Sequence, residues 1–264
     1  MVTQLTQTPS FQSTTANASN ASSVLPLITR QSALFLDFDG TLVDIASQPD
    51  LVVMPDGLQD LLAKLSRELG GALAIVSGRG LHDLDHYLAP LRLPAAAEHG
   101  AVQRNAEGQV THVAVPHLQD IQRVALALAS EHAGLRVEIK TAAIALHYRH
   151  APELETLCLV AMAEAVKRTP GVELIHGKFV FEVKTAGVSK GSAIQAFMAQ
   201  AAFAGRRAIF AGDDTTDESG FPVVQAIGGQ GIKVGAGSTL ADFRCASPAA
   251  LRQWLQNFSE AGNT

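Results

Sequence analysis

Apolar and polar positions alternate along the first hundred residues in the manner of strands and helices. The short apolar runs 33–36, 72–76 and 95–97 are typical of buried strands. Leucines three and four positions apart over 58–69 predict a helix with one apolar face, and a second helix follows at 81–88. Strand, helix, strand, helix, strand is the order that builds a parallel doubly wound sheet.

The same pattern returns near the end of the chain. A helix over 189–200, strands at 208–211 and 231–234, and a last helix opened by Ser247 and Pro248 complete it. The intervening residues have a different character, with strand-like runs at 110–115, 136–139, 144–148, 172–175 and 179–183 and apolar helical stripes over 118–128 and 154–165. That combination is typical of an α+β unit with two helices on one side of a sheet.

We therefore expect an α/β protein with two domains and a tail. Residues 31–101 and 187–264 would form a Rossmann-like parallel-sheet core domain, with residues 102–186 inserted as an α+β cap domain. Residues 1–30 are rich in Ser, Thr, Gln and Asn and have no basic residue before Arg30, unlike a secretory signal. We expect them to be a disordered polar extension.

Composition and charge exclude several classes of protein. No apolar run approaches the ~18 residues that a membrane span requires. A net charge of -5 argues against a nucleic-acid partner. The two cysteines, Cys158 and Cys245, make neither a disulfide framework nor a zinc site, which indicates a reducing cytoplasm. We expect a monomer that acts on a small-molecule substrate and has no membrane partner.

Two carboxylates follow the first predicted strand directly. Side chains two apart on a strand share a face, so Asp37 and Asp39 would leave its carboxyl end together, where open α/β sheets bind ligands. Acids held that close repel one another unless a cation, a proton or a substrate intervenes. The plainer interpretation is an Asp-Gly turn in which the acids only cap the chain.

Three further loops carry candidate residues, in the order Ser77, Lys190 and then Asp213 with Asp214. Taken alone, each has a structural explanation: Ser77 as a helix N-cap, Lys190 as a solvated lysine, and the acids as capping carboxylates. Taken together at the ends of predicted strands and helices, they favour one shared site. Carboxylates, a lysine and a hydroxyl in one place suit phosphoryl transfer, which needs negative charge neutralised on both partners.

The run Asp37-x-Asp39-Gly40-Thr41 after an apolar strand resembles the first motif of the haloacid dehalogenase superfamily. The resemblance implies that Asp37 is a nucleophile that forms an aspartyl phosphate, which water then hydrolyses. It implies that Asp39 protonates the leaving oxygen and then activates the water. An insertion between the Ser77 and Lys190 motifs is also where this superfamily places its larger cap domains.

The resemblance also implies a metal and its surroundings. Mg²⁺ would bind the Asp37 carboxylate, the Asp39 backbone carbonyl and Asp213. Ser77 and Lys190 would hold the phosphoryl oxygens. Asp214 and Asp217 would orient the lysine and the metal's waters from behind.

Further motifs are similar to those of the trehalose-6-phosphate phosphatase family over about residues 32–258. They lie at 36–42, 76–79, 98–100, 138–140, 147–149, 177–182 and 212–218. The resemblance implies Mg²⁺-dependent hydrolysis of trehalose 6-phosphate to trehalose and phosphate, the last step of trehalose biosynthesis. It implies the substrate-binding residues Gly40, Thr41, Gly78, Arg79, Glu98, His99, Glu138, Lys140, His147, Arg149, Lys178 and Glu182.

Several alternatives stay open from the residues. Lys178 and Glu182 also fit a solvated cross-strand ion pair, and His147 fits a structural histidine. Lys184 lies where the family usually has a proline nearby, which puts the second hinge in question. The same chemistry would serve another sugar phosphate, such as sucrose 6-phosphate or a glucosyl- or mannosylglycerate phosphate. A phosphosugar mutase or a non-catalytic sensor would retain the fold as well.

Overall fold

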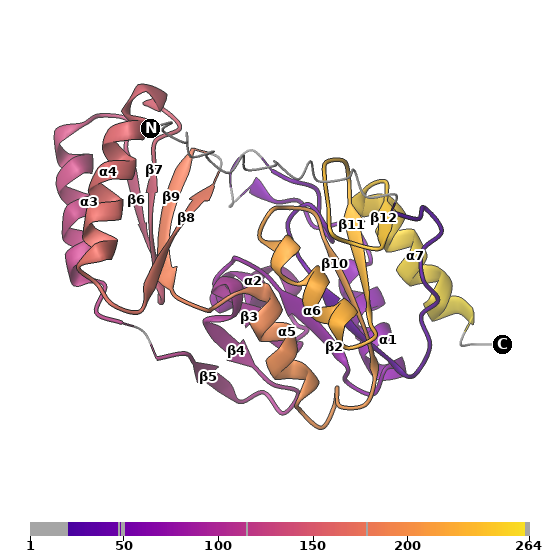
Figure 1. Ribbon diagram of the computed structural model, residues 1–264. Helices are drawn as coiled ribbons and strands as arrows, with labels where there is room; N and C mark the ends of the chain where they lie inside the picture. The colour runs from indigo at the N-terminus through magenta and orange to yellow at the C-terminus, as the bar shows by residue number, and fades with distance from the viewer. Residues whose placement is uncertain (1–20, 47, 49–50, 115, 178, 262–264) are drawn as a thin grey trace, which may run out of the picture.

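The structure is a computed structural model that describes residues 21–46, 48, 51–114, 116–177 and 179–261. Two units lie side by side, a larger core with a mostly parallel sheet and a smaller cap with an antiparallel sheet (Figure 1). The expected α/β fold with an inserted α+β unit is confirmed. Within the described ranges, every helix is too short or too polar to cross a bilayer.

The core sheet is built around the strand that precedes Asp37. Its order is β12-β11-β10-β1-β2-β3-β4-β5, and β1 pairs in parallel with β10 and β2. All five residues of β1 are buried, as a central strand covered on both faces requires. The strands are β1 (Ser32–Leu36), β2 (Leu73–Val76), β3 (Ala95–Ala97), β4 (Val102–Arg104), β5 (Val110–His112), β10 (Arg207–Gly212), β11 (Gln230–Val234) and β12 (Phe243–Cys245).

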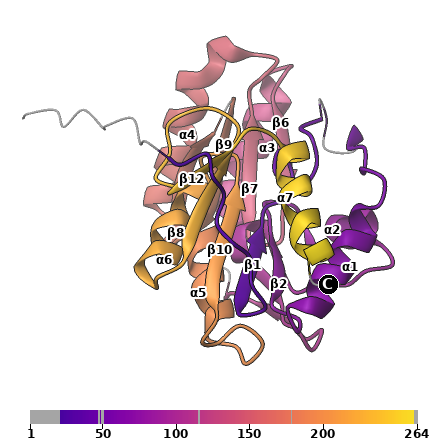
Figure 2. The same ribbon diagram turned by 90° about the vertical axis from the view of Figure 1, so that its right-hand side faces the viewer.

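Helices cover both faces of this sheet (Figure 2). They are α1 (Leu58–Glu68), α2 (Leu81–Leu88), α5 (Lys190–Met198), α6 (Phe221–Ala226) and α7 (Pro248–Ala261). Helices α1 and α7 contact one another on one side, and α5 and α6 on the other. The leucine stripe of α1 is buried as its spacing predicts, with Leu62 and Leu65 fully inaccessible.

The cap has a hydrophobic core of its own. Its sheet has the order β6-β7-β9-β8, all antiparallel, with strands β6 (Arg136–Ile139), β7 (Ala143–His147), β8 (Val172–Gly177) and β9 (Val180–Thr185). Helices α3 (Gln119–Glu131) and α4 (Glu155–Lys167) pack on one face of it. Along β9, Phe181 and Val183 are buried in the cap's core. The alternate residues Glu182 and Lys184 therefore lie on the opposite face.

The expected boundary between core and cap at residue 102 is wrong. Strand β4 pairs antiparallel with β3, and β5 pairs with β4, so both extend the core sheet beyond residue 101. The cap begins only with α3. Both strands are three residues long and each has a single apolar residue, Val102 or Val110, so their sequence does not show which sheet they join.

The expected disordered extension over residues 1–30 is wrong for its last ten residues, and residues 1–20 lie outside the described ranges. Ser22 adds a parallel bridge beside Phe243 at the sheet edge. The Trp254 indole donates a hydrogen bond of 3.0 Å to the Pro26 carbonyl. Ile28 is buried in the core. This segment is ordered because it hydrogen-bonds to backbone groups at the edge strand β12 and covers apolar surface.

Candidate active site

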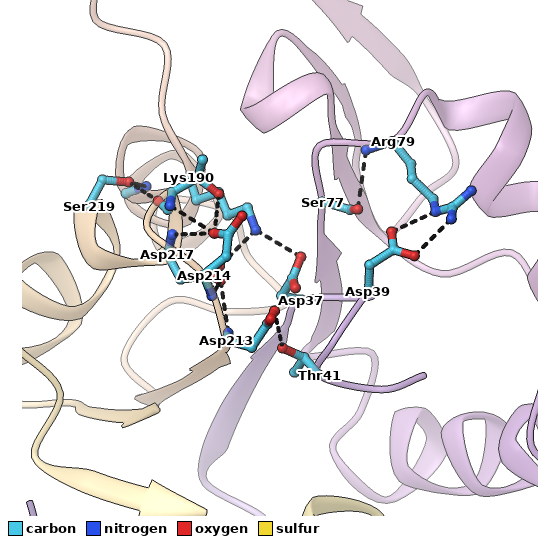
Figure 3. Close-up of polar contacts among 12 residues, drawn as sticks. Asp37, Asp39, Thr41, Ser77, Arg79, Lys190, Asp213, Asp214, Asp217 and Ser219 are labelled. Carbon is cyan, nitrogen blue, oxygen red and sulfur yellow. Dashed lines mark hydrogen bonds and ion pairs between the residues drawn. The ribbon is translucent and has the colours of Figure 1, made fainter. Parts of the chain in front are cut away.

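The expected catalytic residues meet at one edge of the core sheet (Figure 3). Asp37 follows β1, Ser77 follows the neighbouring β2, and Asp213 follows β10 on the other side. Because these strands are parallel neighbours, their carboxyl ends deliver the three side chains to the same place. Lys190 reaches it from the first turn of α5.

Lys190 lies between two buried carboxylates. Its Nζ is 2.8 Å from Asp37 Oδ1 and 2.7 Å from Asp217 Oδ1, and all three residues are almost inaccessible. Burial alone would lower the pKa of Lys190, but the charges of Asp37 and Asp217 outweigh it and raise that pKa. The lysine is therefore a permanent positive charge beside the candidate nucleophile, and a solvated lysine is excluded.

The loop after β10 is fixed by its own hydrogen bonds. Asp217 Oδ2 accepts from the backbone N–H groups of Asp213 and Asp214, each at 2.9 Å. Asp214 Oδ1 accepts from the Thr216 N–H at 2.7 Å. The buried ammonium of Lys233 donates to the Asp213 carbonyl. Asp217 thus contacts Lys190 and the loop directly, while Asp214 mainly holds the loop's shape.

Three carboxylates at this point have an excess of negative charge. Asp37, Asp213 and Asp217 each offer an oxygen within 4.8 Å of the others. Burial raises the pKa of all three, although Lys190 partly opposes the rise. One lysine cannot balance three carboxylates, and carboxylate oxygens are the ligands that Mg²⁺ prefers. The residues present therefore fit a divalent cation.

Gly40 and Thr41 support this acidic group rather than line the cleft. A Cβ at position 40 would lie 2.2 Å from Asp213 Oδ2, and the φ of Gly40 is +76°. Only glycine combines that backbone with so close an approach. The Thr41 hydroxyl donates to Asp213 Oδ1 at 3.3 Å.

The carboxylate of Asp39 points away from Asp37 and is held by Arg79 (Figure 3). The Arg79 guanidinium donates to both oxygens, at 2.6 and 2.7 Å. It also lies over the rings of Tyr87 and Phe38, at 4.9 and 5.6 Å from their centroids. We expected Arg79 to bind substrate; in this structure its guanidinium instead binds the candidate acid.

A cavity of about 830 Å³ separates this edge of the core from the cap. Its size suits a small-molecule ligand. It brings together the core residues Asp37, Asp39, Ser77, Gly78, Arg79, Glu98, His99, Lys190 and Asp214 with the cap residues Glu138, Lys140 and Arg149. A second cavity of about 570 Å³ lies against Glu182, Lys184 and His176, and shares His99 and Lys190 with the first.

The cap presents paired charges to these cavities. Strand register aligns Glu138, Ala145 and Glu182 across three neighbouring strands, so they share one face of the sheet. Because β7 carries only alanines at 143 and 145, Lys140 reaches across it and lies 3.0 Å from Glu182 Oε2. His147 is paired with Glu138 at 3.1 Å and does not line either cavity.

Glu98 and His99 lie in a short turn of 3-10 helix, η2 (Glu98–Gly100), where core and cap meet. Glu98 Oε2 accepts from the backbone N–H of Ala142 at 3.0 Å. The His99 ring packs against Gly78, and its Nε2 is 3.9 Å from Glu182. Burial lowers the pKa of His99 to about 4. The imidazole is therefore neutral at physiological pH.

Two further cap residues were expected to bind substrate. Lys178 lies outside the described residues. Arg149 borders the main cavity with its guanidinium 5.9 Å from the Phe179 ring centroid. At the questioned hinge, the Lys184 ammonium donates to the Val188 carbonyl and pairs with Glu173 at 3.0 Å, so this lysine ties the hinge to the cap sheet.

Sequence reasoning missed two residues that support the site. Lys233 lies between the apolar Ile232 and Val234 in the buried strand β11, and a lysine buried in a strand needs a specific partner. That signal was available in the sequence. Ala142 contributes only a backbone N–H, which no side-chain pattern reveals.

The chain is similar to known phosphatases over most of its length. The trehalose-phosphatase family profile matches residues 35–248. Trehalose-6-phosphate phosphatase of Escherichia coli is 40% identical over 238 residues, covering 89% of this chain and 90% of that protein. A probable trehalose-phosphate phosphatase of Sinorhizobium fredii is 43% identical over 205 residues, with 77% of each chain covered.

Solved structures agree on the fold. A trehalose-6-phosphate phosphatase related protein superposes with a TM-score of 0.69 at 30% identity, over 87% of this chain and 98% of that one. A haloacid dehalogenase-like hydrolase from B. subtilis shares the fold alone, with a TM-score of 0.65 at 14% identity, over 86% of this chain and 99% of that one. The chain therefore belongs to the trehalose-phosphatase family, a group of phosphoric monoester hydrolases on the haloacid dehalogenase fold.

Proposed function

We propose that this enzyme hydrolyses trehalose 6-phosphate to trehalose and phosphate, the last step of trehalose biosynthesis, through a phosphorylated Asp37. The observation that carries the mechanism is Lys190, buried between Asp37 and Asp217 at 2.8 and 2.7 Å. A carboxylate attacks a phosphate ester only when positive charge offsets the repulsion between the two anions. A fixed lysine supplies part of that charge beside the attacking oxygen.

The first half of the reaction transfers the phosphoryl group to the protein. An Asp37 carboxylate oxygen forms the new bond to phosphorus as the bond from phosphorus to the sugar oxygen breaks. Ser77 and Lys190 hold the phosphoryl oxygens. Mg²⁺ bound by Asp37, Asp213 and the Asp39 carbonyl would neutralise the charge that Lys190 leaves uncompensated.

Asp39 supplies the proton in the first half and removes one in the second. An alkoxide is a poor leaving group, so the sugar oxygen needs a proton as it departs. Asp39 then takes a proton from the water that attacks the phosphorylated Asp37 and releases phosphate. Since Arg79 holds the Asp39 carboxylate with two hydrogen bonds, that carboxylate must leave Arg79 to reach the sugar oxygen.

The substrate is proposed from the cap. A disaccharide offers only hydroxyl groups, and Glu138, Lys140 and Glu182 present paired donors and acceptors on one face of the cap sheet. Buried polar groups that a wrong sugar leaves unpaired lose affinity, so such a face selects a hydroxyl pattern. The relative named trehalose-6-phosphate phosphatase at 40% identity supports the same sugar. We also propose that the protein is a monomer and that it is cytoplasmic; the two free, buried cysteines fit a reducing compartment.

The test is phosphate release from trehalose 6-phosphate, with glucose 6-phosphate and sucrose 6-phosphate alongside, in Mg²⁺ and in excess EDTA. We expect release from the trehalose ester that requires Mg²⁺. Asp37→Asn should abolish turnover, and it should still bind the ester because the cap is intact. Release from another ester alone would refute the substrate, and turnover by Asp37→Asn would refute the nucleophile.

A further inference from the structure

One hydrogen bond joins the core to the cap directly above the site. The Glu98 carboxylate, from the core turn η2, accepts the N–H of Ala142, from the cap turn that joins β6 to β7, at 3.0 Å. Glu98 is 9% exposed and Ala142 3%. Because Ala142 is almost inaccessible, loss of the bond would leave a buried N–H unsatisfied.

The bond lies where the chain crosses between the two domains. Ala142 packs in a small apolar cluster with Ala101 and Val188, against the partly buried Val113. Val113 precedes the cap and Val188 follows it, so the cluster includes residues from both chain segments that connect the core to the cap. A carboxylate anchored here sets how the cap's turn sits on the core.

The backbone at Glu98 is held in a strained conformation, which fixes the position of its carboxylate. Glu98 and His99 have φ of +48° and +57°, and neither is glycine. Such conformations cost free energy and persist only where surrounding contacts enforce them. The N–H groups of Glu98 and His99 donate to the Arg79 and Ser77 carbonyls, both at 2.9 Å. The turn η2, which binds the cap, is therefore hydrogen-bonded to the loop that carries Ser77 and would hold the phosphoryl group.

The cap turn that Glu98 binds also contains Lys140. Its N–H donates to the Ala143 carbonyl at 2.9 Å, and its ammonium reaches Glu182 on the far side of β7. Lys140 and Glu98 both border the main cavity. Moving the turn would move the lysine relative to Asp37.

We infer that Glu98 is a positioning residue rather than a reader of the sugar, and that it acts through Ala142. By holding the turn over residues 140–143, it fixes the distance between the sugar-binding Lys140 and the phosphoryl site around Asp37. The inference rests on the proposed hydrolysis of a sugar phosphate, and it assigns Glu98 to selection for the sugar. Esters that Lys140 does not contact gain nothing from this alignment.

The test compares Glu98→Ala with Glu98→Gln on two esters, trehalose 6-phosphate and p-nitrophenyl phosphate, which has no sugar. We expect Glu98→Ala to lower kcat/KM for the trehalose ester about tenfold more than for p-nitrophenyl phosphate, mainly through KM. Glu98→Gln should restore most of that selectivity, because its amide oxygen still accepts from Ala142. Thermal unfolding of each variant verifies that it is folded.

A double-mutant cycle and hydrogen exchange complete the test. If Glu98 acts through Lys140, adding Glu98→Ala to Lys140→Ala should cost little further selectivity. Exchange of the Ala142 amide should be faster in Glu98→Ala than in the parent protein, a readout that needs no substrate. Equal losses on both esters, failure of Glu98→Gln to rescue, additive effects, or unchanged exchange would each overturn the inference. If the parent protein does not hydrolyse trehalose 6-phosphate, the proposed substrate is wrong. Hydrogen exchange then still tests whether Glu98 binds the Ala142 N–H.

Discussion

His99 should make the protein unstable in mild acid. Its ring is buried between the loop after β2 and the cap, against Gly78 and 3.9 Å from Glu182, and its Nδ1 has no hydrogen-bond partner among the described residues. Burial is the largest cause of its lowered pKa, which Lys190 and Lys140 also lower and Glu182 partly opposes. The folded protein therefore resists protonation of a group that the unfolded chain protonates readily.

The size of the effect follows from the two pKa values. In the unfolded chain the histidine binds its proton near 6.5, and in the folded protein only near 4. Stability should therefore be full above about pH 6.5 and should fall progressively as the pH drops toward 4. At about pH 5 the free energy of unfolding should be about 2 kcal/mol lower than at about pH 7.5, from about 1.4 kcal/mol for each unit of pH.

The assay is thermal unfolding of the parent protein and of His99→Asn in EDTA, at about pH 7.5 and about pH 5. Asparagine does not titrate and tolerates the positive φ of position 99. Acidification should lower the Tm of the parent protein by about 5 °C more than that of the variant. The same acid shift in both proteins would refute the reasoning, because other groups would then account for the whole loss.

Three other predictions concern the site itself. Arg79→Met should lower kcat far more for a sugar phosphate than for p-nitrophenyl phosphate, whose leaving group needs no proton from Asp39; equal losses would contradict a link between the two residues. Lys190→Met should abolish phosphate release and destabilise the protein by about 3 kcal/mol by chemical unfolding, since it leaves buried carboxylates unpaired; a variant as stable as the parent would contradict this. Gly40→Ala should raise the Mg²⁺ concentration needed for half-maximal activity by about tenfold or more, because the new methyl displaces the Asp213 carboxylate; an unchanged Mg²⁺ requirement would argue against Asp213 as a ligand.

The partners of the site's side chains were less predictable than their positions. The order of strands placed Asp37, Ser77 and Asp213 at one edge, and the structure brings them together there. Arg79 and Glu98 were expected to touch substrate and both border the main cavity, but the sequence did not show that their side chains also bind Asp39 and Ala142. A sequence motif predicts that a charged residue is present at a given position, but it does not predict which neighbouring group that residue binds.

The sequence by itself determined the periodic elements, the parallel core and the acidic edge that follows β1, because burial on one or two faces leaves a direct pattern of apolar positions. Tertiary structure alone decided that β4 and β5 join the core sheet and that residues 21–30 pack along its edge. It also decided that a core carboxylate holds the cap through Ala142. These features depend on backbone groups finding distant partners. A backbone N–H or C=O is the same at almost every residue, so the sequence carries no mark of where it will bind.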